Sequence, residues 1–415
     1  MFVKRLVYIV LSIVLSVSVA YAAGTASPFS RYGYGEFQNP VSGSLLSMGG
    51  VGYGMRTNRS INPSNPASYT SIDSLTFMMD LGVSGVIDGC KTQVGRNTQF
   101  AGNLDYVSFQ MPLAEWAALS FGLNPLTIVG YKYSFTDTQP SYDYGDSLKV
   151  SQYFYGKGGI TQVYLGLSFD ICDRVAIGVN GKYLFGNIFH YREVEFPDSY
   201  LLKKTMYEDA IFVNAWQCDF GIQYHQPIGK DDELVIGGTY TMKLPMQNTT
   251  EIKSTTNITD FDGTAYEFDY PQTVGAGISY SWNKRLLIGA DVTWMELSKT
   301  KYYSKENVFS DRFVYALGVE YVHNPDSKNY VELMRFRLGA NYANSYAQVN
   351  GSDYNRWAIT FGIGFPFYAT KTTLNLHLEY GQQGSLKGLG LVEQYGKIGI
   401  GVSLNERWFV KRKFK

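Results

Sequence analysis

The side chains best suited to acid–base, nucleophilic or metal chemistry are few in this sequence and lie far apart. They are four histidines and three cysteines, namely His190, His225, His323, His377, Cys90, Cys172 and Cys218. Their spacing matches neither a Cys-x-x-Cys pair nor a zinc-binding set. We therefore expect no metal and no cofactor, and we interpret the cysteines as incidental.

The sequence also lacks the motifs by which common enzymes are recognised. It contains no Gly-x-Ser-x-Gly elbow, no His-Glu-x-x-His and no Walker loop. The run "GGVGYG" at 49–54 has glycines without a strand-turn-helix context, so we expect no phosphate cradle. The protein is not expected to be an enzyme. A lipase that places serine and histidine on neighbouring strands stays open as an alternative.

The remaining polar chemistry is that of charged side chains at positions that we assign to the inside of a barrel. These candidates are Lys182, Asp291, Glu320, Arg335, Arg337, His377 and Glu379. Charges that point into a membrane protein usually pair with one another. We therefore favour pairing among themselves and with the N-terminal segment over a role in binding a solute.

The elements that position these charges show a two-residue period. From 175 to 185 the odd positions read Val, Ile, Val, Gly, Tyr, Phe, and the even positions read Ala, Gly, Asn, Lys, Leu. The alternation returns near 274–282, 313–321, 374–380 and 398–404. A soluble sandwich would fill its inner face with bulky residues, whereas the second face here is small or polar. The pattern predicts strands with one face toward lipid and one toward a lumen.

This assignment of faces can be tested at two adjacent residues. Arginine at Val179 should meet lipid and cost about 2–4 kcal/mol of barrel stability. Arginine at Asn180 should point into the lumen and cost little.

The composition favours the same class of protein. Aromatic residues make up 16% of the chain, with 34 Tyr, 6 Trp and 43 Gly, and charged residues only 17%. No stretch after the N-terminus is long and apolar enough for a spanning helix, which leaves a membrane β-barrel. The formal net charge is zero, so nothing indicates a nucleic-acid partner.

Residues 1–22 have the features of a secretory signal peptide. Lys4 and Arg5 precede the apolar run Leu6–Ala20, and Ala20-Tyr21-Ala22 is a small-x-small cleavage site. A membrane-spanning helix is the weaker alternative because the run is shorter than the roughly 20 residues that a span needs. The signal predicts export, and with a barrel it predicts the bacterial outer membrane and contact with its lipids.

Counting strands gives about fourteen, an even number as in bacterial barrels. Short connections are expected at 112–115, 171–174, 226–233, 283–284, 323–329 and 367–371, and long loops at 90–97, 137–156, 192–206, 250–263, 301–310, 347–354 and 381–389. The predicted fold is an all-β, antiparallel, up-and-down transmembrane barrel over 74–405. Residues 406–415 would form a periplasmic tail.

Residues 23–73 do not fit the barrel pattern. They show no sustained alternation and contain "SMGGVGYGMR" followed by "INPSNPASY". Each proline excludes helix at the preceding residue and removes a backbone donor, so the stretch is irregular but stiff. Irregular backbone cannot face lipid but can lie in a lumen. We predict a hatch inside the barrel, held extended by Pro63 and Pro66 and braced by the amides of Asn62 and Asn65. A periplasmic tail that never enters is the alternative.

These features resemble the long-chain fatty acid transport (FadL-like) family of the outer membrane, particularly its Bacteroidetes members. In that family an N-terminal hatch with an Asn-Pro-Ala motif plugs the barrel. Asn65-Pro66-Ala67 matches the motif, and Asn62-Pro63 resembles a second copy. The chain departs from the family at its end, "NERWFVKRKFK", which has lysine in place of a final aromatic residue.

The resemblance implies uptake of hydrophobic small molecules such as long-chain fatty acids, past the hatch and out laterally or into the periplasm. An apolar pocket would then be built from hatch and barrel side chains, for which the candidates are Phe29, Tyr32, Tyr34, Leu45, Leu46, Met48, Tyr53, Leu184 and Leu287. Some barrels of this kind resemble subunits of secretion or attachment machines. The alternative function is therefore binding of a partner protein at the long loops.

Overall fold

The structure is a computed structural model that describes residues 27–93, 95–140, 147–198, 202–254, 266–349, 351–367 and 370–408. The predicted signal peptide, the first four hatch residues and the end of the predicted tail lie outside these ranges. In the described part, no helix combines the length and the apolar character that crossing a membrane requires.

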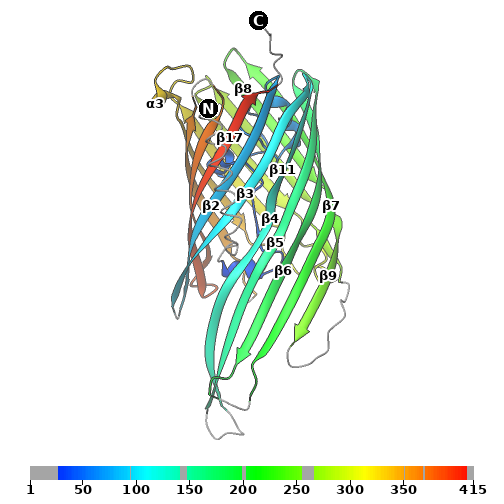
Figure 1. Ribbon diagram of the computed structural model, residues 1–415, viewed down its shortest axis with the longest axis vertical. Helices are drawn as coiled ribbons and strands as arrows, with labels where there is room; N and C mark the ends of the chain where they lie inside the picture. Colours follow the sequence, from blue (N-terminus) through cyan, green and yellow to red (C-terminus); the bar gives the residue numbers. More distant parts are fainter. Residues whose placement is uncertain are drawn as a thin grey trace.

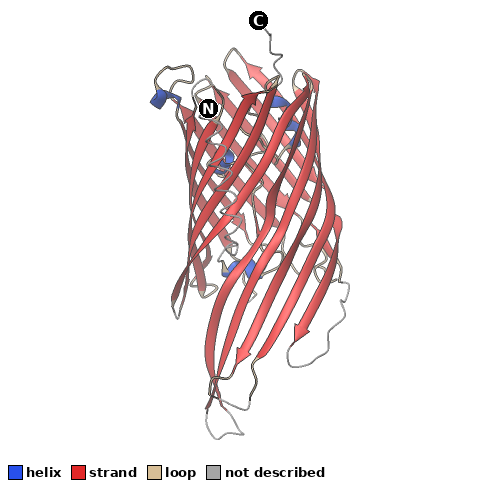
Figure 2. Cartoon of the chain, viewed as in Figure 1, coloured by secondary structure: helices blue, strands red, loops and turns tan. Residues whose placement is uncertain are grey.

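Strands dominate the described chain, and the helical pieces are short (Figure 2). In order, the elements are η1 (Pro28–Arg31), β1 (Glu36–Phe37), α2 (Gly43–Leu46), η2 (Pro66–Ser71), β2 (Thr76–Thr92), β3 (Arg96–Ala114), β4 (Ala117–Pro140), β5 (Ser147–Cys172), β6 (Val175–Glu195), β7 (Thr205–Ile228), β8 (Asp232–Thr241), β9 (Leu244–Ser254), β10 (Phe268–Tyr270), β11 (Thr273–Trp282), β12 (Leu286–Met295), β13 (Arg312–Val322), α3 (Tyr330–Leu333), β14 (Arg335–Asn344), β15 (Asn355–Pro366), β16 (Thr373–Ser385) and β17 (Leu391–Arg407).

The strands from β2 onward close into an antiparallel barrel. Each pairs with its neighbours in the sequence, and β17 returns to pair with β2 from Leu391–Thr92 to Arg407–Thr76. Two positions in the wall are each filled by a stacked pair, meaning two short strands that lie end to end. In the first, β8 and β9 both pair with β7. In the second, β11 pairs with β8 and β10 pairs with β9. Counting each stacked pair once gives fourteen wall positions, so the predicted barrel is confirmed.

The predicted assignment of faces also holds. On β6, Ile177 is 38% exposed, whereas Asn180 and Leu184 are fully buried in the lumen. The apolar residues Leu317 and Ile398 are exposed in the same way on the outer face of the other side of the barrel. Outward side chains of this kind are what lipid would cover.

Strands β4 to β7 are much longer than a membrane requires. They have 24, 26, 21 and 24 residues, whereas a barrel strand spans the bilayer with about 9–11. They project beyond the rest of the wall at one end, which we call the long-strand end (Figure 1). The other end, which carries the tight connections, is the short-turn end.

The projection corrects the loop predictions at 137–156 and 192–206. Most of 137–156 is strand, since β4 runs to Pro140 and β5 begins at Ser147, and both ends of 192–206 are strand, since β6 runs to Glu195 and β7 begins at Thr205. Polarity misled the prediction, because alternating Tyr, Thr and Ser form good strands in water as well as in a membrane.

The hatch lies inside the barrel and packs against its inner wall. Its central part forms one apolar core around Val41, Leu45 and Met48, and its end forms another around Ile61 and Tyr69. The inner wall carries glycine where the hatch backbone comes closest. A Cβ at Gly178 would lie 2.4 Å from the Pro66 carbonyl carbon.

The hatch also fills the space that an arginine at position 180 would need. Asn180 donates from Nδ2 to the Pro63 carbonyl (3.2 Å) and accepts from the Tyr69 hydroxyl (2.9 Å). The expectation that Asn180→Arg costs little therefore applies to the barrel strands alone and not to the hatch.

Candidate functional site: a seam in the barrel wall

The wall is interrupted between β3 and β4. These strands pair from Ala114–Ala117 at the short-turn end only as far as Val107–Leu123. Beyond that point, 96–106 of β3 pair with β2 alone, and 124–140 of β4 pair with β5 on one side. The two strands diverge toward the long-strand end (Figure 1). We call this unpaired stretch the seam.

Two irregularities open the seam. The β2–β3 register shifts next to Gly82, where Asp105 is left out of the ladder. The β4–β5 register shifts between Pro125 and Thr127. A bulge bends a strand and increases its twist, and proline supplies no N–H to the ladder, so pairing between β3 and β4 ends where these features begin.

The hatch closes the seam with its own short strand. Glu36 and Phe37 of β1 pair antiparallel with Ile128 and Thr127 of β4, and the Gln38 N–H donates to the Leu126 carbonyl (2.9 Å). The Ser30 hydroxyl extends the closure, because it donates to the Gly130 carbonyl (3.1 Å) and accepts from the Gly130 N–H (3.0 Å). An unpaired edge inside a bilayer costs several kcal/mol for each bare group, which explains why the hatch covers this one.

A large apolar cluster lies behind the seam. We call it the aromatic cluster, and its buried members are Tyr34, Leu126, Val129, Tyr131, Phe154, Ile160, Leu184, Ile188, Ile211, Val213, Ala215, Met246, Phe268, Tyr270, Met295, Leu297, Phe309, Tyr346 and Ala347. Three of these side chains, at 126, 129 and 131, come from the unpaired part of β4. The apolar interior thus reaches the wall where the hatch covers β4, and where β3 and β4 are joined not by ladder pairing but by a side-chain bond from Gln99 Nε2 to the Lys132 carbonyl (3.1 Å).

The Asn-Pro stretch fixes the hatch by side-chain hydrogen bonds to backbone. Asn65 caps η2 by accepting from the Ala67 N–H (3.1 Å), and its Nδ2 donates to the carbonyls of Tyr53 (2.8 Å) and Ile222 (3.2 Å). Asn62 donates to the Gly52 carbonyl (2.6 Å). Pro66 occupies the first turn of η2, where a missing N–H costs nothing.

The structure places the candidate pocket residues in four locations. Tyr32, Tyr34 and Leu184 belong to the aromatic cluster or pack against it. Leu45, Leu46, Met48 and Leu287 instead form the central core of the hatch. Phe29 packs on Tyr354, with ring centroids 4.4 Å apart, and the Tyr53 hydroxyl lies 2.9 Å from Thr293 Oγ1. They do not form one pocket.

Six of the seven candidate lumen charges have an ion-pair or hydrogen-bond partner, whereas neither ring nitrogen of His377 forms a hydrogen bond to the described residues. Lys182 pairs with Asp219, Glu320 pairs with Arg335 and Arg337, and Asp291 accepts from the N–H groups of Gly52 (2.6 Å) and Tyr53 (2.9 Å). His377 Nε2 lies 3.4 Å from Glu379, which also pairs with Arg356 (3.4 Å). These contacts tie strands to one another and to the hatch.

Burial also shifts the titration of hatch groups. Desolvation, reinforced by the neighbouring Arg335, lowers the pKa of Arg59 to about 10. Desolvation raises the pKa of Tyr53 to about 12. Both values keep these side chains in their usual charge states at neutral pH.

Two cavities of about 130 and 160 Å³, lined by both polar and apolar side chains, lie beside the hatch and share Phe37, Gly50 and Arg312. The smaller cavity is also lined by Glu36, Asp88 and Glu393, which the sequence predictions missed. Glu393 could have been found, because it shares the odd-numbered face with Gly399 and Gly401. Glu36 gave no signal, since β1 has only two residues.

The whole chain, residues 1–415, matches one family model, described as BamG. The chain belongs to the BamG family. No protein with a curated description matches it by sequence.

Solved structures show the fold that this BamG family member adopts. It is similar to the CymD monoaromatic hydrocarbon channel (TM-score 0.57, 14% identity, 90% of this chain and 100% of that one). It is also similar to the Ralstonia pickettii toluene transporter TbuX (0.56, 13%, 88% and 98%) and to a Pseudomonas aeruginosa FadL homologue (0.57, 14%, 89% and 98%). The FadL-like barrel is thus confirmed as a fold, and the closer relation to Bacteroidetes members stays a prediction.

Proposed function

We propose that the protein takes up hydrophobic small molecules across the bacterial outer membrane, after removal of its signal peptide. The short-turn end faces the periplasm and the long-strand end faces outward. A solute passes from outside into the aromatic cluster and leaves sideways through the seam when β1 withdraws from β4.

The observation that supports this route most directly is the position of the aromatic cluster behind a stretch of wall where β3 and β4 do not pair and the hatch covers β4. Opening the seam requires loss of the two-residue β1 pairing, of the contacts of Gln38 and Ser30, and of the bond from Gln99 to the Lys132 carbonyl. The barrel ladder itself stays intact, because closure between β17 and β2 lies elsewhere.

The substrate class follows from the lining of this route. Aromatic and aliphatic side chains dominate it, which suits toluene-like hydrocarbons and the tails of long-chain fatty acids alike. Two of the structurally similar proteins are described as a monoaromatic hydrocarbon channel and a toluene transporter. We include both neutral hydrocarbons and fatty acids in the proposal.

A reversible cross-link tests the route. In a variant whose three cysteines are replaced by serine, Phe37→Cys and Thr127→Cys place thiols on directly paired residues of β1 and β4. Joining them with a short cleavable thiol cross-linker should reduce uptake of a fluorescent aromatic hydrocarbon and of a fluorescent fatty acid to background. Cleavage should restore both.

The matched control ties the hatch to the wall away from the seam. Asn58→Cys with Asn405→Cys uses a contact in which Asn405 Nδ2 donates to the Asn58 carbonyl (2.9 Å). This cross-link should leave uptake unchanged. Equal uptake with the seam joined and cleaved would show that solutes take another path.

The long strands favour a second candidate function. A channel does not require strands of 24 and 26 residues, and the projecting parts of β4 to β7 offer a surface for a partner protein outside the cell. Replacing 134–153 by Asn-Gly would join Tyr133 to its partner Phe154 by a tight turn. If partner binding is the function, uptake should survive this change while a protein that co-purifies with the wild type is lost.

A further inference from the structure

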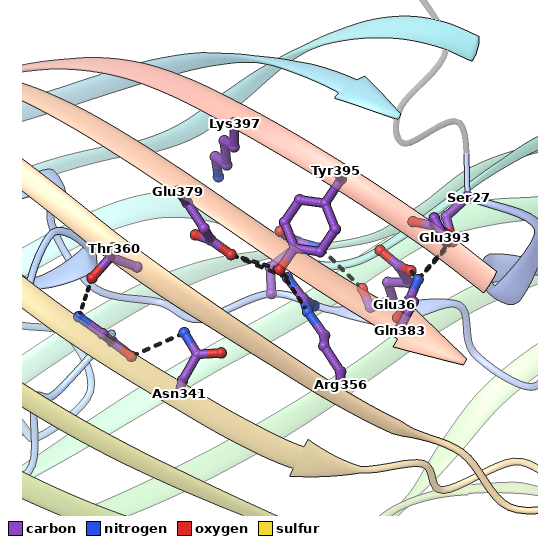
Figure 3. Close-up of polar contacts among 12 residues, drawn as sticks. Ser27, Glu36, Asn341, Arg356, Thr360, Glu379, Gln383, Glu393, Tyr395 and Lys397 are labelled. Carbon is purple, nitrogen blue, oxygen red and sulfur yellow. Dashed lines mark hydrogen bonds and ion pairs between the residues drawn. The ribbon is translucent and has the colours of Figure 1, made fainter. Parts of the chain in front are cut away.

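Two lysines on the outer face of the barrel have no anionic partner. They are Lys132 of β4 and Lys157 of β5, both exposed, and neither ammonium forms an ion pair or a hydrogen bond with any described residue. In the lumen, by contrast, the Arg356 guanidinium bonds to the Tyr395 hydroxyl (2.7 Å) and pairs with Glu379 (3.4 Å) (Figure 3). Unpartnered cations on the wall of a membrane protein attract anionic lipid headgroups.

Strand register places both lysines on one outward surface. Tyr131 of β4 and Ile160 of β5 point inward, because both belong to the aromatic cluster. Successive side chains alternate between the two faces of a strand, so Lys132 and Lys157 point outward. Lys132 lies opposite Tyr155 in the β4–β5 ladder, and Lys157 is the next outward residue of β5. The two lysines are therefore diagonal neighbours about 7–8 Å apart, close enough for both side chains to reach one phosphate.

Aromatic rings of the same surface hold the ammonium of Lys157. Its Nζ lies 5.6 Å from the ring centroid of Phe189 and 5.8 Å from that of Tyr191, both on β6. Tyr155 stacks on Tyr191 with ring centroids 4.6 Å apart. Cation–π attraction fixes the ammonium on one side, and its exposure leaves N–H groups free on the other. We call Lys132, Tyr155, Lys157, Phe189 and Tyr191 the outer patch.

The outer patch lies just beyond the apolar band of the wall. Toward the short-turn end, the same face carries Val163 and Leu165 on β5, which are 42% and 57% exposed, and Ile177 on β6. A barrel strand crosses the hydrocarbon with about 9–11 residues, and β5 and β6 continue past that length to the patch. Tyrosine and lysine next to an apolar band are typical of the headgroup level of a membrane.

The carboxylates on this surface leave the patch positively charged. Glu208 of β7 lies opposite one ring of the patch, and β6 separates it from Lys157. Adjacent strands are about 4.8 Å apart, so the backbones of these two residues are more than about 9 Å apart. Glu193 and Glu195, which lie nearer the long-strand end, both pair with Lys204. An anion between the two lysines therefore meets attraction first.

We propose that the outer patch binds the phosphate of an outer-leaflet glycolipid of the lipid A type. The phosphate lies between the two ammonium groups, the sugars contact the tyrosine rings, and the acyl chains run along the apolar band at Val163 and Leu165. Because Lys132 belongs to the part of β4 that does not pair with β3, the bound lipid borders the seam. The inference goes beyond solute uptake and takes from the proposed function only that the long-strand end faces outward.

Native mass spectrometry of the full-length mature protein in detergent tests the patch, with phosphorylated lipid A as the probe. Lys132→Gln with Lys157→Gln should lower the apparent affinity about tenfold or more, because each cation at a headgroup contributes to binding. Lys132→Arg with Lys157→Arg keeps both charges and should bind as the wild type does. Lipid A without its phosphate should bind the wild type no better than the phosphorylated lipid binds the glutamine variant.

Lys91→Gln with Lys387→Gln is the matched control, because both lysines are exposed at the long-strand end but lie outside the patch. It should leave the affinity unchanged. Equal binding of the two lipids by the wild type, full binding by the glutamine variant of the patch, or an equal loss in the control would overturn the proposal. So would loss of a co-purifying protein from the patch variant with lipid binding unchanged, since the patch would then serve a protein partner.

Lipid binding in detergent does not depend on transport. If lipid A binds as expected while uptake ignores the seam cross-link, the patch stands and the proposed route fails. If the cross-link abolishes uptake while the glutamine variant binds lipid A like the wild type, the route stands and the patch fails.

Discussion

Asn65 joins three parts of the molecule through one amide. It caps η2, holds the carbonyl of Tyr53 within the hatch and reaches the carbonyl of Ile222 on β7. Pro66 restricts the backbone of Asn65 to the extended region, from which its side chain can cap η2. The residue therefore determines where the hatch sits along the barrel axis as well as its local shape.

Asn65→Ala should loosen the hatch without weakening the barrel. The change leaves buried backbone groups without partners, at about 1–3 kcal/mol each. Exchange of the amides at 61–72 should accelerate, while the thermal unfolding of the barrel stays unchanged. Ser64→Ala is the control, since the Ser64 side chain has no hydrogen bond in the described structure. Equal effects of the two variants would show that the amide is not the brace.

Val179 and Asn180 lie on opposite faces of β6 and should respond to arginine in different ways. Val179→Arg should cost about 2–4 kcal/mol of barrel stability in a refolding assay, because the charge enters lipid. Asn180→Arg should leave barrel stability near wild type and displace the hatch, since Asn180 bonds to Pro63 and Tyr69. A stability loss at 180 and none at 179 would reverse the assigned register.

At the scale of elements, β6 shows how one strand serves both lipid and hatch. Its inner face carries Gly178 where Pro66 approaches, and its outer face carries Gly181, where a Cβ would have no heavy atom nearer than 3.9 Å. At position 178 only glycine allows the hatch backbone to come this close. At position 181 no backbone approaches, so close approach does not require glycine there. The hatch and the strand thus fit each other through the absence of a side chain.

Gly178→Ala should therefore unseat the hatch, and Gly181→Ala should not. A methyl group at 178 would lie 2.4 Å from the Pro66 carbonyl carbon and 2.6 Å from the Ala67 nitrogen, so η2 must move. Permeation of a small polar antibiotic through cells that carry each variant measures the result. Increased permeation for 178 alone is expected, and no difference between the variants would place the hatch away from β6.

For the whole molecule, the barrel and the hatch should be separable. The ladder between β17 and β2 closes the barrel without any hatch residue, so removal of the hatch bares the edge of β4 at the seam and leaves the pairings among the wall strands in place. Deleting 27–72 should leave a protein with a β-dominated spectrum and heat-modifiable migration on a gel, but with free passage of polar solutes. Failure of the deleted chain to insert, with the signal peptide retained, would mean that the hatch is needed for folding.

The barrel could be predicted from the sequence because alternation is a local signal. The alternation around Val179 and Asn180 predicted both that this segment is a strand and which of its faces points toward lipid. The seam could not be predicted, because it depends on register shifts at Gly82 and Pro125 and on a partner strand of two residues. Glu36, Asp88 and Glu393 line one cavity, and no local pattern relates residues so far apart in the sequence.

The stacked strands on β7 have a mechanical consequence. β8 pairs with 219–228 and β9 with 207–214, and between them the Met242 N–H bonds to the Cys218 carbonyl (3.3 Å). One wall position further, Pro271 separates β10 from β11. In the circuit of fourteen positions this break lies opposite the continuous closure of β17 on β2. The barrel therefore has an uninterrupted ladder on one side and shorter strands placed end to end on the other. We expect a thinner bilayer to deform the wall where β8 ends and β9 begins and to leave the closure of β17 on β2 unchanged.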